Sequence, residues 1–236
     1  VVDRLLRELR IDLNVGRPQV SYREGFLGES EVSGEVSQEV GGKLQKGKLK
    51  LRILSSEGAE SLDFEAQINE KEYPKEMIEA VKNSVLRASP SGFDLGYPII
   101  KTKVILTGLE YEEGETTELG LAMAVSSAMS KLRFAKEVVT YEPVMSVQLS
   151  VPGEFSGDVI SDINSRKGKI EGIETKEVRD LINCEIPLKR MFGYTTDLRS
   201  KTQGRGSFSM NFKEYQTLSN QERDELFKKF GISRDY

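Results

Sequence analysis

Apolar positions recur along the chain with two different periods, and each period predicts a different element. Alternation of apolar and polar residues indicates strands, whereas spacing of three and four residues indicates helices. Helical spacing follows Pro74, which stands where a helix begins, and continues to a Ser-Pro-Ser-Gly break at residues 89–92. Thr116 and Thr117 cap a longer helix that we expect to extend to about Lys136. In this half the alternating stretches, and so the predicted strands, are residues 20–24, 31–40, 46–54, 62–68 and 98–109.

The pattern starts again after the break at Tyr141-Glu142-Pro143, and the second half has a different order of elements. In chain order we expect a strand, a helix, two strands, a helix and a strand, at residues 144–151, 154–167, 169–175, 181–187, 188–199 and 207–212. Right-handed crossovers allow two such units to form one antiparallel sheet with both helices on one face. This order predicts a ferredoxin-like βαββαβ domain. Ser219 and Glu222 form a capping box for a last helix that ends at Gly231.

The first residues have the character of a different domain. Helical spacing over residues 1–10 is followed by alternation over 11–15, and then by Gly16 and Pro18. We interpret residues 1–17 as the tail of a preceding domain whose upstream part is missing. The expected organisation is an α+β protein with a first full domain at 18–140, a ferredoxin-like domain at 141–215, and a C-terminal helix and tail at 216–236.

Composition argues against several kinds of chemistry. The 236 residues include no histidine, which excludes histidine-based catalytic triads. They include one cysteine, Cys184, which excludes disulfides within the chain and thiolate zinc sites. The net charge of -4 argues against a chain that is basic throughout, so a polyanion would have to bind a local patch. No apolar run reaches the roughly 18 residues of a transmembrane helix. We therefore expect a cytoplasmic protein that does not contact membranes.

Residues 42–49 contain most of a phosphate-binding loop but lack its essential end. Leu49 stands where Ser or Thr must hold magnesium, and a strand pattern follows the lysine in place of a helix. The same segment is strongly basic, with Lys43, Lys46, Lys48, Lys50 and Arg52 and no acid between them. Two interpretations remain open. The residues form a strip that contacts nucleic-acid phosphates, or they form a solvated strand face that lysines protect from edge pairing.

An acidic cluster precedes the longer helix of the first domain, at Glu110, Glu112, Glu113, Glu115 and Glu118. The helix dipole favours acids near a helix N-terminus, which accounts for Glu118 and at most Glu115. The order of acids and glycines does not fit the spacing of an EF-hand loop. We therefore predict no metal site and interpret the cluster as an acidic loop.

Residues 191–208 form the most specific string of the last third. Gly193 inside a predicted helix costs about 1 kcal/mol relative to alanine, which suggests close packing or the close approach of a partner. Gly204 and Gly206 allow a tight turn that would present the Arg205 guanidinium to a phosphate. An ordinary connection from helix to strand is the alternative.

This string resembles the C-terminal domain of bacterial elongation factor G, a translational GTPase. The likeness continues in order over nearly the whole chain, through Asn14–Val20, Tyr22-Arg23-Glu24, Tyr73-Pro74-Lys75-Glu76, Gly96-Tyr97-Pro98, Glu142-Pro143-Val144-Met145 and Gly157–Asp162. The resemblance implies a ribosomal-S5-like βαβ domain followed by a ferredoxin-like domain, which are the family's fourth and fifth domains. It also implies an upstream GTPase domain that binds GTP and Mg²⁺, with no cofactor and no catalytic residue in the present chain.

In the family that this chain resembles, the tip of the fourth domain contacts tRNA and mRNA on the small ribosomal subunit, and the fifth domain lies near large-subunit RNA. By position, the resemblance places the first tip loop at residues 41–48 and the second at 111–113. Large-subunit RNA is expected to contact Arg199, Lys201 and Arg205. The contacts expected at the tip are Gly42, Lys43, Gln45, Lys46, Gly47, Lys48, Tyr111, Glu112 and Glu113.

Both tip loops depart from the family's usual sequence. The first usually reads Gly-Gly-Arg-Gly-Gln-Tyr-Gly-His, and here Lys43, Lys46 and Lys48 replace the arginine, tyrosine and histidine. The second usually reads Tyr-His-Asp, and here two glutamates follow Tyr111. These glutamates would repel RNA phosphates unless lysines of the first loop pair with them.

We therefore expect a divergent, monomeric paralogue with weakened or altered ability to support translocation. One alternative is a factor specialised for ribosome recycling or for translation under stress. Another is a noncatalytic RNA- or protein-binding module that acts without the ribosome.

Overall fold

The computed structural model describes residues 19–232, and the expectations for residues 1–17 lie outside this range. Contacts divide the chain into two compact units. The first holds Tyr22–Glu142 and the segment from Tyr215 onward, and the second is built on Pro143–Glu214. Two long strands, β6 (Val138–Pro152) and β9 (Ser207–Thr217), have residues in both units. The expected boundary after residue 140 therefore falls inside a strand, and the expected C-terminal segment groups with the first unit.

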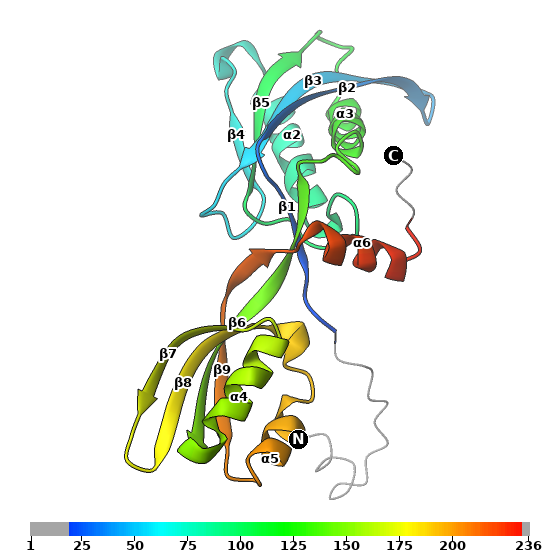
Figure 1. Cartoon of the computed structure of the whole chain (residues 1–236). Coiled ribbons are helices and arrows are strands. Elements are labelled where there is room, and N and C mark those ends of the chain that lie inside the picture. The colour runs from blue at the N-terminus through cyan, green and yellow to red at the C-terminus, as the bar shows by residue number, and fades with distance from the viewer. Residues whose placement is uncertain (1–18, 233–236) are drawn as a thin grey trace, which may run out of the picture. The chain divides into compact units, whose positions relative to one another are not determined.

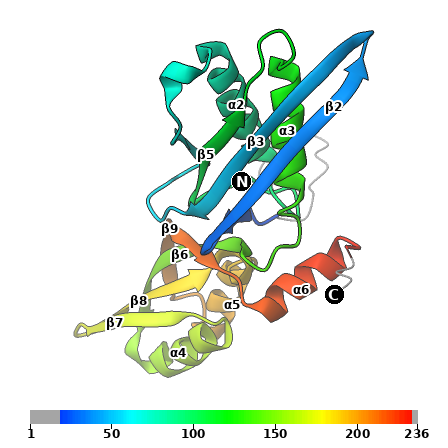
Figure 2. The ribbon, with the colours of Figure 1, turned by 90° about the horizontal axis from the view of Figure 1, so that it is seen from above.

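The first unit has a four-stranded sheet with two helices on one of its faces (Figure 2). β4 runs parallel to β5 and α2 (Lys75–Ala88) connects them, which confirms a βαβ unit. α3 (Glu118–Ser130) follows β5. The core lies between the sheet and the helices. The strands stand in the order β2-β3-β5-β4, with bounds Glu29–Val40, Lys43–Ser55, Thr102–Glu110 and Asp63–Ala66.

β2 and β3 form a long hairpin through a two-residue turn. Val40 and Lys43 are its last pair, and Gly41 and Gly42 between them have φ angles of 60° and 76°. A type I′ turn needs positive φ at both central residues, which glycine adopts without steric cost. Because β3 continues directly from this turn, no helix follows the lysines, and a phosphate-binding loop does not form here.

α3 ends earlier than the sequence predicts, at Ser130 in place of about Lys136. After this point the N–H groups of Lys131 and Leu132 donate to carbonyls three residues back. Bonds of this kind tighten the chain and end a helix. They also turn the Leu132 side chain into the core, where it is 2% exposed. The buried face of α3 includes Leu121, Ala124, Val125 and Ala128, and Leu132 extends it from a turn outside the helix.

Pro143 does not interrupt the chain as the sequence suggests, because β6 runs through it. Up to Tyr141 the strand pairs with β1 (Arg23–Phe26), and from Val144 onward it pairs with β8 (Arg179–Pro187). Pro143 lies where the strand changes partners, so its missing N–H breaks no bond of either ladder.

The second unit confirms the predicted βαββαβ order. Its sheet has the order β7-β8-β6-β9, with both helices on one face (Figure 1). Gly193 does not lie inside a helix as predicted: it precedes the first residue of α5 with a φ of 78°, a conformation that glycine tolerates. Cys184 is buried in this core, and burial raises the pKa of its thiol to about 12. The elements not yet bounded are α4 (Ser156–Ser165), β7 (Lys169–Thr175) and α5 (Tyr194–Lys201).

The last helix, α6 (Asn220–Lys229), begins after Ser219, whose hydroxyl accepts the N–H of Glu222 as the capping pattern predicts. It is held within the first unit by a buried ion pair of 2.7 Å between Arg223 and Asp94. Within residues 19–232, no helix has both the length and the apolar character needed to cross a bilayer. The remaining short turns of 3₁₀ helix are η1 (Glu70–Glu72), η2 (Ser89–Ser91), η3 (Gly153–Phe155) and η4 (Leu188–Arg190).

Candidate nucleic-acid interface

The predicted basic strip lies on the face of the first unit's sheet that points away from the helices, which we call the outer face. Along β3, side chains alternate between this face and the core, where Leu49, Leu51 and Ile53 are at most 1% exposed. This alternation confirms that one face of the strand is basic and the other apolar. The strip residues on the outer face are Lys46, Lys48, Lys50 and Arg52.

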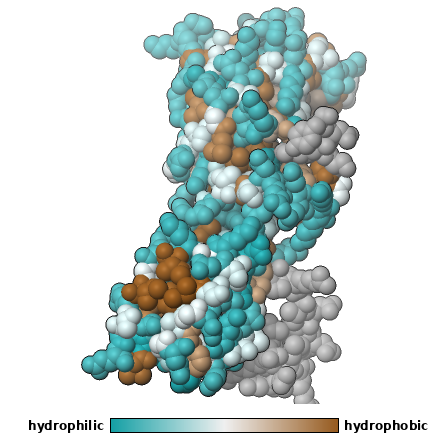
Figure 3. All heavy atoms as spheres, viewed as in Figure 1, coloured by the Kyte–Doolittle hydropathy of each residue, from teal (hydrophilic) through white to brown (hydrophobic). Residues whose placement is uncertain are grey.

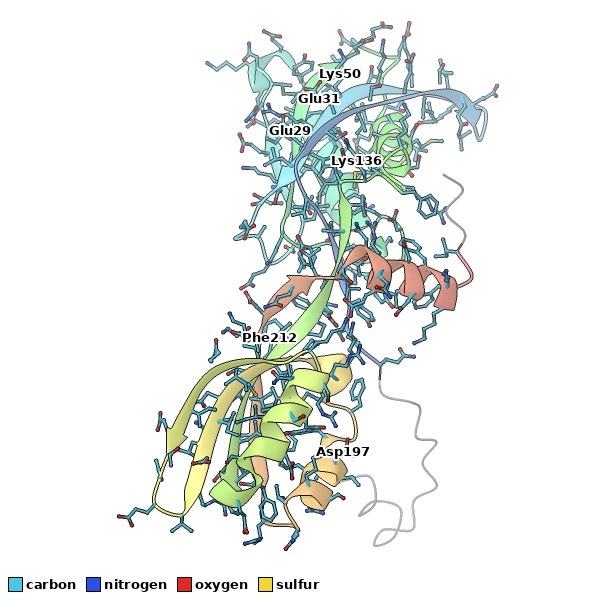
Figure 4. The ribbon with its side chains drawn as sticks, viewed as in Figure 1. Glu29, Glu31, Lys50, Lys136, Asp197 and Phe212 are labelled. Atoms are coloured by element: carbon cyan, nitrogen blue, oxygen red, sulfur yellow. The ribbon has the colours of Figure 1, made fainter. Side chains whose placement is uncertain are left out.

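The neighbouring strand β2 places acids beside two of these four bases. Glu31 stands opposite Arg52 and Glu35 opposite Lys48 in the register of the hairpin. Glu29 lies 3.6 Å from Arg52, and Glu110 of β5 lies 2.8 Å from Lys48. Figure 4 labels Glu29 and Glu31 of β2 and Lys50 of β3 on this hairpin, and in Figure 3 the visible surface of the first unit is mainly hydrophilic. The outer face is therefore balanced in charge, which favours the solvated-face interpretation for most of the strip.

Lys46 joins the two predicted tip loops in an arrangement that we call the loop clasp. Its ammonium nitrogen lies 2.5 Å from the carboxylate of Glu112 and 2.7 Å from that of Glu115. The backbone is held as well, because the N–H of Thr117 donates to the carbonyl of Lys46 at 3.0 Å. The N–H of Glu112 donates to the hydroxyl of Thr116. The condition stated from the sequence is thus met for Glu112, which pairs with a lysine of the first loop, but Glu113 has no ion pair among those described for residues 19–232.

The clasp changes the proton affinity of its members. Hydrogen bonds from Lys46 to Glu112 and then to Glu115 raise the pKa of Lys46 above its usual value. The bond from Lys46 lowers the pKa of Glu115. Lys46 is therefore fully charged at neutral pH, but two neighbouring carboxylates already balance its positive charge.

Two of the predicted tip residues face inward. Gln45 is 8% exposed, and its side-chain oxygen accepts a hydrogen bond from the Thr117 hydroxyl at 2.8 Å. A Cβ atom at Gly47 would lie 2.4 Å from the backbone of Gly120 in α3. These two residues hold α3 against β3. Lys43, Glu112 and Glu113 are exposed, and Tyr111 is half-buried.

The three cations predicted to contact large-subunit RNA lie on the second unit, and all three are exposed. Lys201 is 3.6 Å from Asp162. Arg205 lies 2.6 Å from Glu154, and its guanidinium stacks over the ring of Phe155 at 4.7 Å. Two of the three are thus paired with acids of their own unit, and Arg199 has no ion pair among those described for residues 19–232.

Acidification should open the loop clasp. A carboxyl whose pKa is lowered by folding stabilises the fold at pH values above its ordinary pKa, which is near 4.5 for Glu115. This stabilisation is lost as the pH falls through the lowered pKa. We expect the clasp to be intact at neutral pH and to open only below about pH 4.5. Amide chemical shifts of residues 112–116, followed by NMR during acid titration, measure this opening.

The Lys46→Met variant is the control for this titration. Without the ammonium group, Glu115 should titrate at a higher pH, close to the ordinary carboxyl value. An identical titration in the variant and the original chain would contradict the clasp.

Comparison with known proteins agrees with the fold and the order of the two units. The model of the family described as elongation factor G, domain IV, matches residues 18–134. The model described as elongation factor G C-terminus matches residues 139–226. A crystal structure of a protein from Thermus thermophilus is similar with a TM-score of 0.77 and 25% identity. The similarity covers 91% of this chain and 32% of that one, so this chain spans about a third of that protein's length.

The fold and these matches define a translation factor module made of two domains. More particularly, the chain belongs to the elongation factor G family and carries domain IV followed by the C-terminal domain of that family.

Proposed function

We propose that this chain is the ribosome-binding part of an elongation-factor-G-like GTPase that acts in the cytoplasm, in tRNA–mRNA translocation or a related step. The single observation that carries the proposal is the presence of the family's domain IV and C-terminal domain in the family's order. In the proposed full-length protein, GTP and Mg²⁺ bind an upstream domain. The residues of this chain bind RNA through their charge and position, without a covalent step. The protein acts as a monomer.

The loop clasp supports the proposal that this protein is a divergent paralogue. A lysine that two carboxylates already neutralise attracts an RNA phosphate less than a free lysine does, because the acids lie within 3 Å of it. The proposed consequence is weaker or altered translocation, and a role in recycling or stress translation is the alternative within the same family.

Ribosome pelleting across a range of salt concentrations tests the proposal. Phosphate contacts make binding fall steeply as salt rises, because each contact releases counterions. We expect the chain to pellet with ribosomes at low salt and to be released as salt increases. Absence of ribosome binding, combined with salt-sensitive binding to free RNA, would favour the non-ribosomal module. Translocation by the full-length protein at the rate of a housekeeping factor would contradict the divergent role.

Opening the clasp by mutation should strengthen ribosome binding. In the double variant Glu112→Gln and Glu115→Gln, Lys46 loses both acid partners and becomes available to phosphates. We expect about two- to fivefold tighter binding at low salt, the scale of an exposed ion pair. The slope of log K against log salt should steepen by about 1, the value for one additional phosphate contact.

Glu113→Gln is the matched control for this measurement. Glu113 is exposed in the same loop and has no ion pair among those described for residues 19–232. Its replacement removes an acid without freeing Lys46. If this variant strengthens binding and steepens the slope as much as the double variant does, net charge and not the clasp governs binding.

A further inference from the structure

A cavity of about 370 Å³ opens on the first unit beside the middle of the basic strip. This volume lies in the range of small-ligand sites. No local pattern in the sequence marks it, because its walls come from separate segments. They are Ser33 of β2, Lys48–Lys50 of β3, Gln67–Asn69 and Tyr73 in the segment after β4, and Thr107–Glu110 of β5.

Strand topology explains why the chain leaves this space open. The parallel pairing of β4 with β5 ends at Ala66 and Leu106, and the N–H of Gln67 then donates to the carbonyl of Leu106. Beyond this point, within the described residues, β5 is paired only with β3, so one edge of residues 107–110 has no strand beside it. Such an edge presents backbone N–H and C=O groups.

An irregularity between β3 and β5 lies at the wall of the same space. The register shifts between Lys50 and Leu51, so that Thr107 is an extra residue on β5. A bulge of this kind changes the direction of the side chains around it and is common beside functional sites. Gly108 stands opposite Lys50, and the carbon stem of Lys50 lies along it, because a Cβ atom at Gly108 would be 3.5–3.6 Å from Lys50 carbons.

Lys50 differs from the other cations of the strip. Lys46, Lys48 and Arg52 each have a carboxylate within 4 Å. Lys50 is exposed and has no carboxylate partner among the ion pairs described for residues 19–232, and its register neighbours are the uncharged Ser33 and Gly108. The cavity lining contains two lysines and one glutamate, and that glutamate pairs with Lys48. One positive charge, on Lys50, is therefore available to an anion.

The remaining walls offer an aromatic ring and hydrogen-bonding groups. Tyr73 is half-buried and packs against the core, which fixes its ring at the cavity wall. Asn69 donates its amide to Glu72, which leaves its carbonyl oxygen as an acceptor. The Thr107 hydroxyl donates to the carbonyl of Lys50 and keeps lone pairs.

We propose that this cavity binds one unstacked nucleotide of single-stranded RNA, with the phosphate on Lys50 and the base against Tyr73. A nucleotide combines a phosphate, a flat base and polar base edges, and each matches one of the features above. The proposal rests on the proposed function, because it names a further contact between this domain and RNA.

Binding of hexauridylate and of uridine 5′-monophosphate to the full chain tests the proposal by NMR. We expect both ligands to shift the amide signals of Thr107 and Gly108. Tyr73→Leu should weaken hexauridylate binding about five- to a hundredfold, the range for loss of a stacked base. Tyr73→Phe, which keeps the ring, should bind almost as well as the original chain and controls for misfolding.

Ser33→Glu gives the sharpest test because its position is exposed and faces Lys50. The new glutamate would lie opposite Lys50 in the hairpin, as Glu35 lies opposite Lys48. We expect it to weaken hexauridylate binding as much as Lys50→Ala does. Lys136→Ala is the matched control, since it removes one lysine charge whose side chain is 91% exposed, outside the cavity.

The possible results separate the cavity proposal from the proposed function. Ribosome pelleting without shifts at residues 107–110 would reject the cavity and leave the proposed function standing. Shifts at the cavity without any ribosome binding would support the cavity and reject the ribosomal role. Binding of the mononucleotide but not of hexauridylate would identify a site for free nucleotides and overturn the assignment to RNA.

Discussion

Replacing Gly34 with alanine is expected to lower the free energy of unfolding of the first unit by about 1–3 kcal/mol, the usual cost of overpacking. α3 lies so close to β2 that a Cβ atom at this position would stand 1.8 Å from the carbonyl oxygen of Ala124. The clash is with backbone in the middle of a helix, so no side-chain rotation can relieve it. Urea unfolding, followed by far-UV circular dichroism, measures the change.

Gly58→Ala is the control for this experiment. Gly58 has no atom within 4 Å of its hypothetical Cβ and does not have a positive φ. We expect little change in stability there. A Gly34→Ala variant as stable as the Gly58→Ala variant would show that α3 moves away from the sheet at low cost.

Replacing Glu24 with glutamine is expected to destabilise the first unit by about 2 kcal/mol or more, because buried backbone donors lose their acceptor. The carboxylate is fully buried and accepts four backbone N–H bonds, from Phe93, Asp94, Leu95 and Tyr97, at 2.6–2.9 Å. An amide keeps one acceptor oxygen and turns its NH₂ group toward two of these donors. Each buried donor left without an acceptor costs about 1–3 kcal/mol. Thermal or urea unfolding measures the loss.

Glu31→Gln is the matched control, because Glu31 is exposed on β2 and the change in charge is the same. Its stability should stay close to that of the original chain. Equal stability of the two variants would mean that the loop at residues 93–97 does not depend on the carboxylate. Slower hydrogen exchange at Asp94 and Leu95 in the original chain than in Glu24→Gln would locate the effect in that loop.

The elements that depend on neighbouring residues are predictable from the sequence. The βαββαβ order follows from the spacing of apolar residues, which is two in the strands and three to four in the helices. The basic alternation of Lys46 to Arg52 predicts which face of β3 is buried. Even the turn at Gly41-Gly42 has a local cause, since two glycines supply both positive φ angles.

The features that depend on distant residues cannot be predicted in this way. Pro143 has the local character of a break, and only the change of partner from β1 to β8 shows why a strand tolerates it. Lys46 meets Glu112 across 66 residues of sequence. Charge along one strand predicts a basic strip, but the acids that neutralise it come from β2, from the end of β5 and from the loop after it.

Two of the segments that carry the resemblance to the family are distant in the sequence and are in contact in the folded chain. Tyr22-Arg23-Glu24 and Gly96-Tyr97-Pro98 lie more than 70 residues apart, yet the Glu24 carboxylate holds the N–H of Tyr97. Sequence reasoning assigns no role to Glu24. A lone buried acid has no local signature, because its four donors are backbone groups that every residue except proline possesses.

The single thiol of the chain has a practical consequence for experiments. Cys184 is 1% exposed in the core of the second unit, and it stays protonated at the pH used for maleimide coupling. A cysteine introduced at the exposed Lys43 would therefore be the sole residue to react with a fluorophore. Energy transfer from that dye to a labelled tRNA would then test whether the hairpin tip approaches tRNA, as the proposed function expects.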